Sequence, residues 1–166
     1  DLSGWNTASL TNMYGMFWQA TVFTGDVSTW DVDGVTDMRN VFNNARNFNG
    51  ALNDWDVSNA TNMGGMFGNA VVFNQDLSGW NTAAVTNMSS MFSSASVFNT
   101  NIGGWNTSSV EYTTAMFKSA TAFNQDISNW DVSSVVKMKE MFDNAEAFNQ
   151  SLSEWDVSAV TDMSYM

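Results

Sequence analysis

The sequence predicts an α/β solenoid, a stack of 25-residue coils that each contain a short strand and a short helix. Three observations predict it. Tryptophan recurs every 25 residues without insertion, at Trp5, Trp30, Trp55, Trp80, Trp105, Trp130 and Trp155. All twelve phenylalanines and all twelve methionines fall in four further columns of the same repeat. The apolar spacing within one repeat suits first a strand and then a helix, and a fixed period of this length is typical of solenoids.

The helix is predicted over residues 85–95. Its apolar positions i, i+3, i+6, i+7 and i+10, which form one helical face, are held by Val85, Met88, Met91, Phe92 and Ala95. Thr86 is a candidate N-cap, and threonine recurs in this column at Thr11, Thr36, Thr61 and Thr161. Glu111 and Val136 interrupt the column, so we expect the fifth and sixth helices to begin less regularly.

The strand is predicted in the segment before each column tryptophan. In the better-kept copies this segment reads FNQD[LI]S, with apolar residues four apart and polar residues between them, which suits a short strand. We expect the asparagine of this phrase to form a ladder that holds the backbone of neighbouring coils together. It recurs at Asn49, Asn74, Asn99, Asn124 and Asn149.

One such unit cannot bury its apolar residues alone, because a short helix and a short strand expose edges on both sides. We therefore expect a single uninterrupted array over residues 1–166, about 6.6 repeats, in which the Trp, Met and Phe columns form the core. Neither end of the sequence shows a polar cap, so we expect the array to belong to a longer chain or to stack end to end.

The composition excludes several partners. The formal net charge is −12 and only five residues are Lys or Arg, whereas nucleic-acid binding needs clustered cations. No run of apolar residues approaches the length of a membrane span, so we expect no membrane insertion in this stretch. There is no cysteine, which excludes a disulfide framework and a thiolate metal site.

The phrase FNQD[LI]S.W[DN][VT]S.V[TV].M..MF..A..FN occurs at residues 73–98 and again at 123–148. It resembles the bacterial surface protein repeat of about 26 residues, which is grouped with BspA-like leucine-rich-repeat proteins and is also known as the PARCEL repeat. The resemblance covers the whole chain. It implies a leucine-rich-repeat-like solenoid on a secreted or surface-anchored protein. The sequence EYT at residues 111–113 departs from the pattern, so we expect local irregularity there.

The sequence offers little for catalysis, and we expect no enzyme. It contains no histidine, which excludes Ser-His and Cys-His nucleophile pairs. Its carboxylates recur in columns, whereas a catalytic carboxylate pair is normally unique in a chain. Turn-capping carboxylates in water are the simpler interpretation of these columns. The chemical alternative is calcium, since stacked carboxylates and amides could supply its oxygen ligands. The candidate ligands are Asp1, Asp26, Asp31 and Asp56, and no other cofactor is expected.

Two aromatic residues break the columns and are candidate partner contacts. Trp18 occupies a column of mostly small and polar residues, and Tyr14 stands four residues earlier, so the two would be neighbours on a helix. An exposed Tyr and Trp pair is typical of protein interfaces and of surfaces under stacked sugars. Alternatively, the pair covers an adjoining segment of chain.

We therefore expect a non-catalytic extracellular or cell-surface scaffold for adhesion or self-assembly, whose partners are other protein chains or copies of itself. The alternative is a carbohydrate- or small-ligand-binding module, which calcium could assist, with an ice-binding surface as a remote variant. A binding site needs one face that departs from the repeat, whereas a scaffold does not. The uniformity of the faces therefore distinguishes the two classes.

Overall fold

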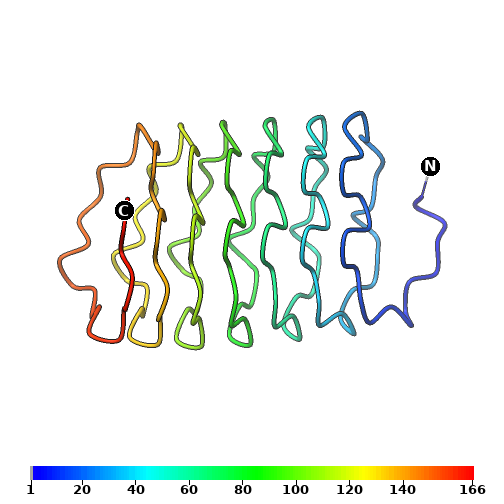
Figure 1. Ribbon diagram of the computed structural model, residues 1–166. Coiled ribbons are helices and arrows are strands. Elements are labelled where there is room, and N and C mark those ends of the chain that lie inside the picture. Colours follow the sequence, from blue (N-terminus) through cyan, green and yellow to red (C-terminus); the bar gives the residue numbers. More distant parts are fainter. Residues whose placement is uncertain (1) are drawn as a thin grey trace.

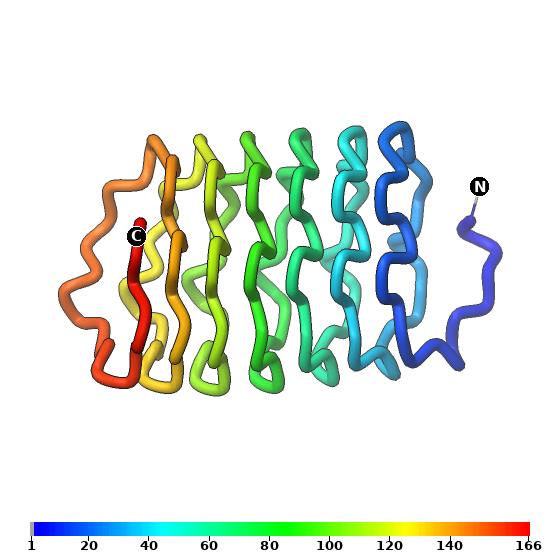
Figure 2. Tube along the Cα trace, viewed as in Figure 1, coloured from blue at the N-terminus to red at the C-terminus, as the bar shows by residue number. Residues whose placement is uncertain are grey.

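The computed structural model describes residues 2–166, which form a row of stacked coils (Figure 1, Figure 2). We number the coils 1 to 7 by their column tryptophans, from Trp5 to Trp155. The described residues contain no helix, and their only regular strand pairing is a series of single parallel bridges, such as Asn62 to Asn87, between adjacent coils. The expected α/β solenoid of leucine-rich-repeat type is therefore wrong. The chain is a regular repeat around a stacked aromatic core. The described residues accordingly contain no helix that is long and apolar enough to cross a membrane.

The predicted helix at residues 85–95 is replaced by consecutive β-turns. In the first turn the amide of Met91 donates to the carbonyl oxygen of Met88 at 3.1 Å, and the second turn repeats this bond four residues later. The third residues of the two turns, Ser90 and Ser94, have φ of 56° and 58°, as type II turns require. The first and last residues of both turns are buried. Two consecutive turns thus place apolar residues at the same positions as a helical stripe.

The other amides of this segment explain why no helix forms. We call residues 86–95 of coil 4 a ladder segment, and its equivalents are residues 11–20, 36–45, 61–70, 111–120, 136–145 and 161–166. The amides of Met88, Ser90, Phe92 and Ser94 donate to carbonyl oxygens of coil 5 at 2.7 to 2.9 Å. An α-helix needs those amides for bonds within the segment. Backbone hydrogen bonds between coils therefore take the place of the hydrogen bonds within the segment that a helix would need.

These bonds run in one direction along the array. The amide of Met88 donates to the carbonyl of Tyr112, and the amide of Thr113, in the same peptide group as that carbonyl, donates to Lys137. Each such peptide group accepts from the coil before it and donates to the coil after it. The ladder segments therefore form four rows of peptide groups bonded head to tail. The regularity includes residues 111–113, so the expected irregularity there is wrong.

The threonine column is a fifth row and runs the other way. The amide of Thr86 donates to the carbonyl of Thr61 at 2.8 Å, and its hydroxyl donates to the same oxygen at 3.2 Å. Thr86 is thus not an N-cap, because there is no helix for it to cap. It ties its coil to the preceding one, and Glu111 and Val136 make the same backbone bond without a hydroxyl.

The predicted strand is also absent, but its asparagine ladder is confirmed. The side-chain oxygen of Asn74 accepts the amide of Asn99, and that of Asn99 accepts the amide of Asn124, both at 2.9 Å. Gln125 donates to the side-chain oxygen of Asn99 at 3.0 Å. Side-chain amides therefore hold this part of adjacent coils together.

The core consists of the predicted columns. The ring of Phe92 stacks on Phe98 of the same coil, with centroids 3.9 Å apart, and on Phe117 of the next coil at 5.8 Å. The Trp80 ring stacks on Trp105 at 6.3 Å. Every column indole from Trp30 onwards donates its N–H to a backbone carbonyl 28 residues earlier. Tryptophan thus supplies apolar area and a hydrogen bond between coils.

The left-handed positions give a first testable prediction. Ala115 has φ of 54° in a column where Gly15 and Gly65 also have positive φ. This conformation costs a residue with a Cβ about 1 to 2 kcal/mol, whereas glycine adopts it freely. Part of this gain is offset because glycine is also freer in the unfolded chain. Ala115→Gly should therefore stabilise the fold by about 0.5 to 1 kcal/mol, as measured by urea denaturation.

The matched control is Ala120→Gly in the same coil. Ala120 is buried and its φ is not positive, so the substitution removes a packed methyl without relieving strain. It should destabilise the fold by about 1 kcal/mol. Shifts of the same sign in both variants would contradict the backbone assignment.

Candidate interaction face

The ladder segments present three outward columns of side chains, which we call the ladder face. In coil 4 they are Asn87, Ser89 and Ser93, which are partly exposed, while Met88 and Phe92 in the same segment are buried. The four rows of hydrogen bonds hold successive segments side by side. The face is therefore continuous from coil to coil.

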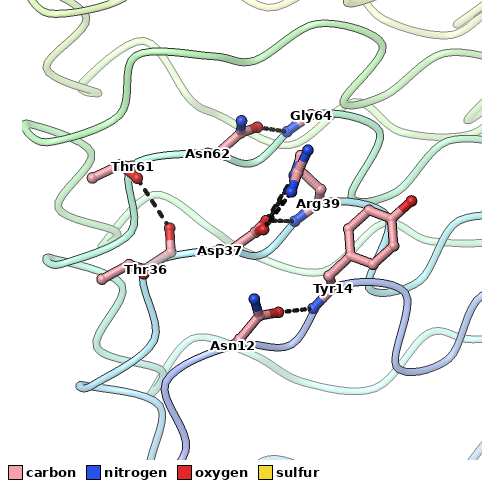
Figure 3. A network of polar contacts seen from close by, with 8 residues as sticks. All are labelled: Asn12, Tyr14, Thr36, Asp37, Arg39, Thr61, Asn62 and Gly64. Atoms are coloured by element: carbon pink, nitrogen blue, oxygen red, sulfur yellow. Dashed lines mark hydrogen bonds and ion pairs between the residues drawn. The ribbon is translucent and has the colours of Figure 1, made fainter.

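In coils 1 to 3 the face carries a polar network (Figure 3). The side chains of Asn12, Asp37 and Asn62 each accept the backbone amide of the residue two positions later, at 2.8 to 3.1 Å. The guanidinium of Arg39 lies 2.6 Å from the Asp37 carboxylate and 4.9 Å from the centre of the Tyr14 ring. The hydrogen bond from the Arg39 side chain lowers the pKa of Asp37. Arg39 thus links coils 1 and 2 across the face.

In coils 5 and 6 the face carries a second charged cluster. The Lys118 ammonium lies between Asp143, at 2.8 Å, and Glu140, and hydrogen bonds to these two carboxylates raise its pKa. The hydrogen bond from Lys118 lowers the pKa of Glu140, which Lys139 also approaches at 3.3 Å. Lys137 donates to a threonine hydroxyl at 3.1 Å, and no carboxylate of the described residues lies within ion-pair distance of it.

Charge is divided unequally between the ladder segments and the turns. The turn segments, residues 76–84 of coil 4 and their equivalents, contain eleven acidic residues of the chain and no Lys or Arg. The ladder segments contain four of the five basic residues against five acidic ones. They also contain all three tyrosines and the one tryptophan outside the column. The ladder segments are therefore nearly neutral and depart from the repeat, whereas the turn segments carry only negative charge, in every coil except coil 5.

Tyr14 and Trp18 both lie on the ladder face. Their side chains are 53% and 55% exposed. The helical argument that made them neighbours fails with the helix, and Tyr14 packs against Arg39 instead. Their role as a partner contact remains a prediction. Sequence reasoning missed Tyr112 on the same face and the exposed Tyr165 in the left-handed column of the same segments, although comparison within their columns would have found them, since both replace smaller residues.

The candidate calcium ligands serve as turn caps. The carboxylates of Asp26 and Asp56 accept the amides of Ser28 and Ser58 at 2.9 Å, and Asp31 makes the equivalent bond at 3.3 Å. The hydrogen bonds from these serines lower the pKa of Asp26 and Asp56. The turn-capping interpretation is thus confirmed for these three residues.

The fourth candidate, Asp1, lies outside the described residues. Within residues 2–166, no three His, Cys, Asp or Glu side chains gather so that they could hold a metal ion. Calcium binding stays an untested alternative.

The capping carboxylates give a prediction for pH. Hydrogen bonds lower the folded-state pKa of capping residues such as Asp76 and Asp126. Their contribution is complete above the ordinary aspartate pKa of about 3.9 and is lost as the pH falls through the lower folded-state pKa. The melting temperature should therefore fall when the pH is lowered from 5 to about 2.

The control for this titration is a triple variant in which Asp26, Asp76 and Asp126 are each replaced by asparagine. Asparagine accepts the same bond without titrating, and Asn101 already does so at 2.9 Å in coil 5. When the pH is lowered, the melting temperature of the triple variant should fall less than that of the unmodified chain. Equal losses would show that these caps do not carry the acid sensitivity.

A cavity of about 290 Å³ opens beside coil 1. Its lining belongs largely to core columns and includes Trp5, Leu10, Met16 and Trp30. The equivalent side chains of the middle coils are buried. The cavity is thus a section of core that no described coil covers, and we assign it no ligand.

The fold and this face define a repeat protein that buries an unbroken aromatic stack and varies along one surface. The chain belongs to the family described as "Mycoplasma protein of unknown function, DUF285", whose model matches residues 1–99 and 72–166. No curated protein and no solved structure gives a match.

Proposed function

We propose that the chain is a non-catalytic scaffold on the outside of a cell that presents its ladder face to other protein chains, in adhesion or self-assembly. The observation that carries this proposal is that the ladder segments hold all three tyrosines, the one tryptophan outside the column and four of the five basic residues. Tyrosine, tryptophan and arginine are enriched where proteins contact one another. The variable residues run from coil 1 to coil 7, and a long shallow face of this kind suits a macromolecule better than a small ligand.

Two further observations support the proposal. The most conspicuous side chains already have structural roles, because the rings fill the core and the capping carboxylates hold turns. The sequence also resembles the BspA-like bacterial surface repeat, which implies a secreted or surface-anchored protein. A cell-surface location is the simplest setting for a scaffold with this resemblance.

The location is tested by brief trypsin treatment of intact cells that produce the natural protein. Peptides ending at Arg39 or Arg46, both exposed, should be released before those of a cytoplasmic marker protein. Release only after lysis would contradict the proposed location.

The contact is tested with beads coated with the chain. They should cluster with one another or attach to cells, and the Tyr14→Ser/Trp18→Ser variant should do so less while keeping its melting temperature. The matched control is Val22→Ser/Val97→Ser, which removes exposed apolar side chains outside the ladder segments. Equal loss in both variants, or none in either, would contradict a role for the ladder face.

The second candidate function is carbohydrate binding, favoured by the exposure of Tyr14 and Trp18 on a polar surface. It predicts that soluble glycans inhibit bead attachment to cells. Direct protein contact predicts no such inhibition.

A further inference from the structure

One column of the ladder face caps backbone amides. In five coils its residue is asparagine or aspartate, and the side-chain oxygen accepts the amide two positions later at 2.8 to 3.1 Å. These capping residues are Asn12, Asp37, Asn62, Asn87 and Asp162. Figure 3 shows the first three of these bonds. The capped amides are therefore directed toward the ladder face, where the capping side chains lie.

Coils 5 and 6 lack this cap. Tyr112 and Lys137 occupy the capping column there. Lysine has no acceptor, and the only side-chain acceptor of tyrosine is the hydroxyl at the far end of its ring. The amides of Thr114 and Lys139 accordingly have no hydrogen-bond partner within residues 2–166, and both residues are partly exposed. Two successive coils thus leave the same amide free to pair with another molecule.

The two uncapped amides lie side by side. Tyr112 and Lys137 form a parallel bridge, and the amide of Thr113 donates to the carbonyl oxygen of Lys137 at 3.0 Å. Equivalent atoms of segments bonded in this way are about 4.8 Å apart. The two oxygens of one carboxylate can therefore each accept one amide, and hydrogen bonds to a charged acceptor are about twice as strong as neutral ones. A neutral amide side chain would have to share its one oxygen between both donors.

The charged side chains around these amides also favour a carboxylate from outside. Three of the four basic residues of the ladder segments lie in coils 5 and 6. The Lys137 ammonium has no carboxylate within ion-pair distance among the described residues. The neighbouring carboxylates have partners of their own, since Asp162 caps an amide of its own coil and Glu140 and Asp143 bind Lys118. No described carboxylate of the chain itself accepts either uncapped amide.

We infer that the amides of Thr114 and Lys139, assisted by the ammonium of Lys137, bind a carboxylate group of a partner protein. The oxygens of this carboxylate take the positions that asparagine and aspartate oxygens hold in the other five coils. The inference rests on the proposed function, because it names the chemical group that one part of the ladder face recognises in its partner.

Titration with sodium acetate tests the site, with sodium chloride at the same ionic strength as the reference. In amide NMR spectra of the chain, the proton signals of Thr114 and Lys139 should shift to lower field until they saturate, because both amides gain a charged acceptor. The amides of Gly64 and Ser89 already have caps, so they serve as internal controls and should keep their positions. Shifts of Thr114 and Lys139 no larger than those of the controls would overturn the site.

Two variants separate the missing caps from the charge. Tyr112→Asn/Lys137→Asn supplies both caps, so acetate should no longer shift the two amides, while the melting temperature stays the same or rises. Lys137→Met leaves the amides uncapped and removes only the ammonium, so it should raise the acetate dissociation constant about two- to fivefold, the effect of one exposed ion pair. Unchanged acetate binding in the asparagine variant, or an equal loss in both variants, would overturn the inference.

Two further soluble carboxylates distinguish the source of the ligand. N-acetylaspartate amide carries the acidic side chain of a protein, and glucuronate carries the carboxylate of an acidic sugar. The aspartate derivative should bind at least as tightly as glucuronate, and tighter binding of glucuronate would overturn the assignment to a protein partner. A chain that binds none of the three carboxylates would leave the proposed function standing, since trypsin release from cells and bead attachment to cells test it independently.

Discussion

Replacing Trp80 with alanine is expected to lower the free energy of unfolding by about 3 to 5 kcal/mol, the usual cost of truncating a buried aromatic residue. The side chain is buried in coil 4, and its ring lies 6.3 Å from that of Trp105 and 6.2 Å from that of Phe67. Truncation removes these contacts and leaves a cavity between coils. Urea denaturation followed by circular dichroism measures the loss without relying on tryptophan fluorescence.

The control Trp80→Phe separates the ring from its hydrogen bond. Phenylalanine keeps much of the aromatic volume but cannot donate to the carbonyl of Leu52, which the indole N–H reaches at 3.0 Å. The same carbonyl still accepts the amide of Trp55, so the loss of the indole hydrogen bond should cost only about 0.5 to 1.5 kcal/mol, and this variant should fall between Trp80→Ala and the unmodified chain. An unchanged Trp80→Ala curve would mean that the tryptophan column is not part of the core.

The stacking, the core and the asparagine ladder could be predicted because each is a property of a whole column. In a strict repeat a residue contacts its own equivalents in the adjacent coils, so one buried member such as Phe92 implies that the column is buried. Asn99 likewise contacts Asn74 and Asn124, which a 25-residue period places beside it. Period alone determines these neighbours, whatever the local conformation of the coil.

The local conformation could not be predicted from apolar spacing, because two β-turns and one helix bury the same positions. The distinguishing signal lay in the polar columns. The first left-handed column holds Gly15, Asn40, Gly65 and Ser90, which are poor helix formers, and glycine and asparagine tolerate positive φ. Ala115 and Glu140 occupy the same column and weaken the signal.

The candidate site was predicted only in part for the same reason. Exposure of Tyr14 and Trp18 followed from the composition of their columns. The continuous face did not, because helical geometry would separate Asn87 and Ser89 by about 200° around the axis. In the ladder segment both belong to one outward face, which also carries Tyr112 and Lys137. The interaction face is thus a consequence of the bonds between coils and could not be recognised before them.

Phe92→Ala is the second variant with a large expected effect, again about 3 to 5 kcal/mol. The ring is fully buried and stacks on Phe98, Phe67 and Phe117 at 3.9, 5.6 and 5.8 Å. Phe92→Leu, which keeps an apolar side chain in the cavity, should lose clearly less. Equal losses in urea denaturation would show that ring stacking adds little beyond burial.

A double-mutant cycle tests whether stability passes from coil to coil through these rings. Phe92→Ala and Phe117→Ala remove two rings that stack 5.8 Å apart in adjacent coils, so their combined loss should differ from the sum by about 0.5 to 3 kcal/mol. Phe23 lies three coils away, roughly 14 Å at strand-like spacing, so Phe92→Ala and Phe23→Ala should add within about 0.5 kcal/mol. Coupling confined to the first pair is the behaviour of an array whose coils contact only their neighbours. Equal coupling in both pairs would instead require the whole row of rings to respond as one unit.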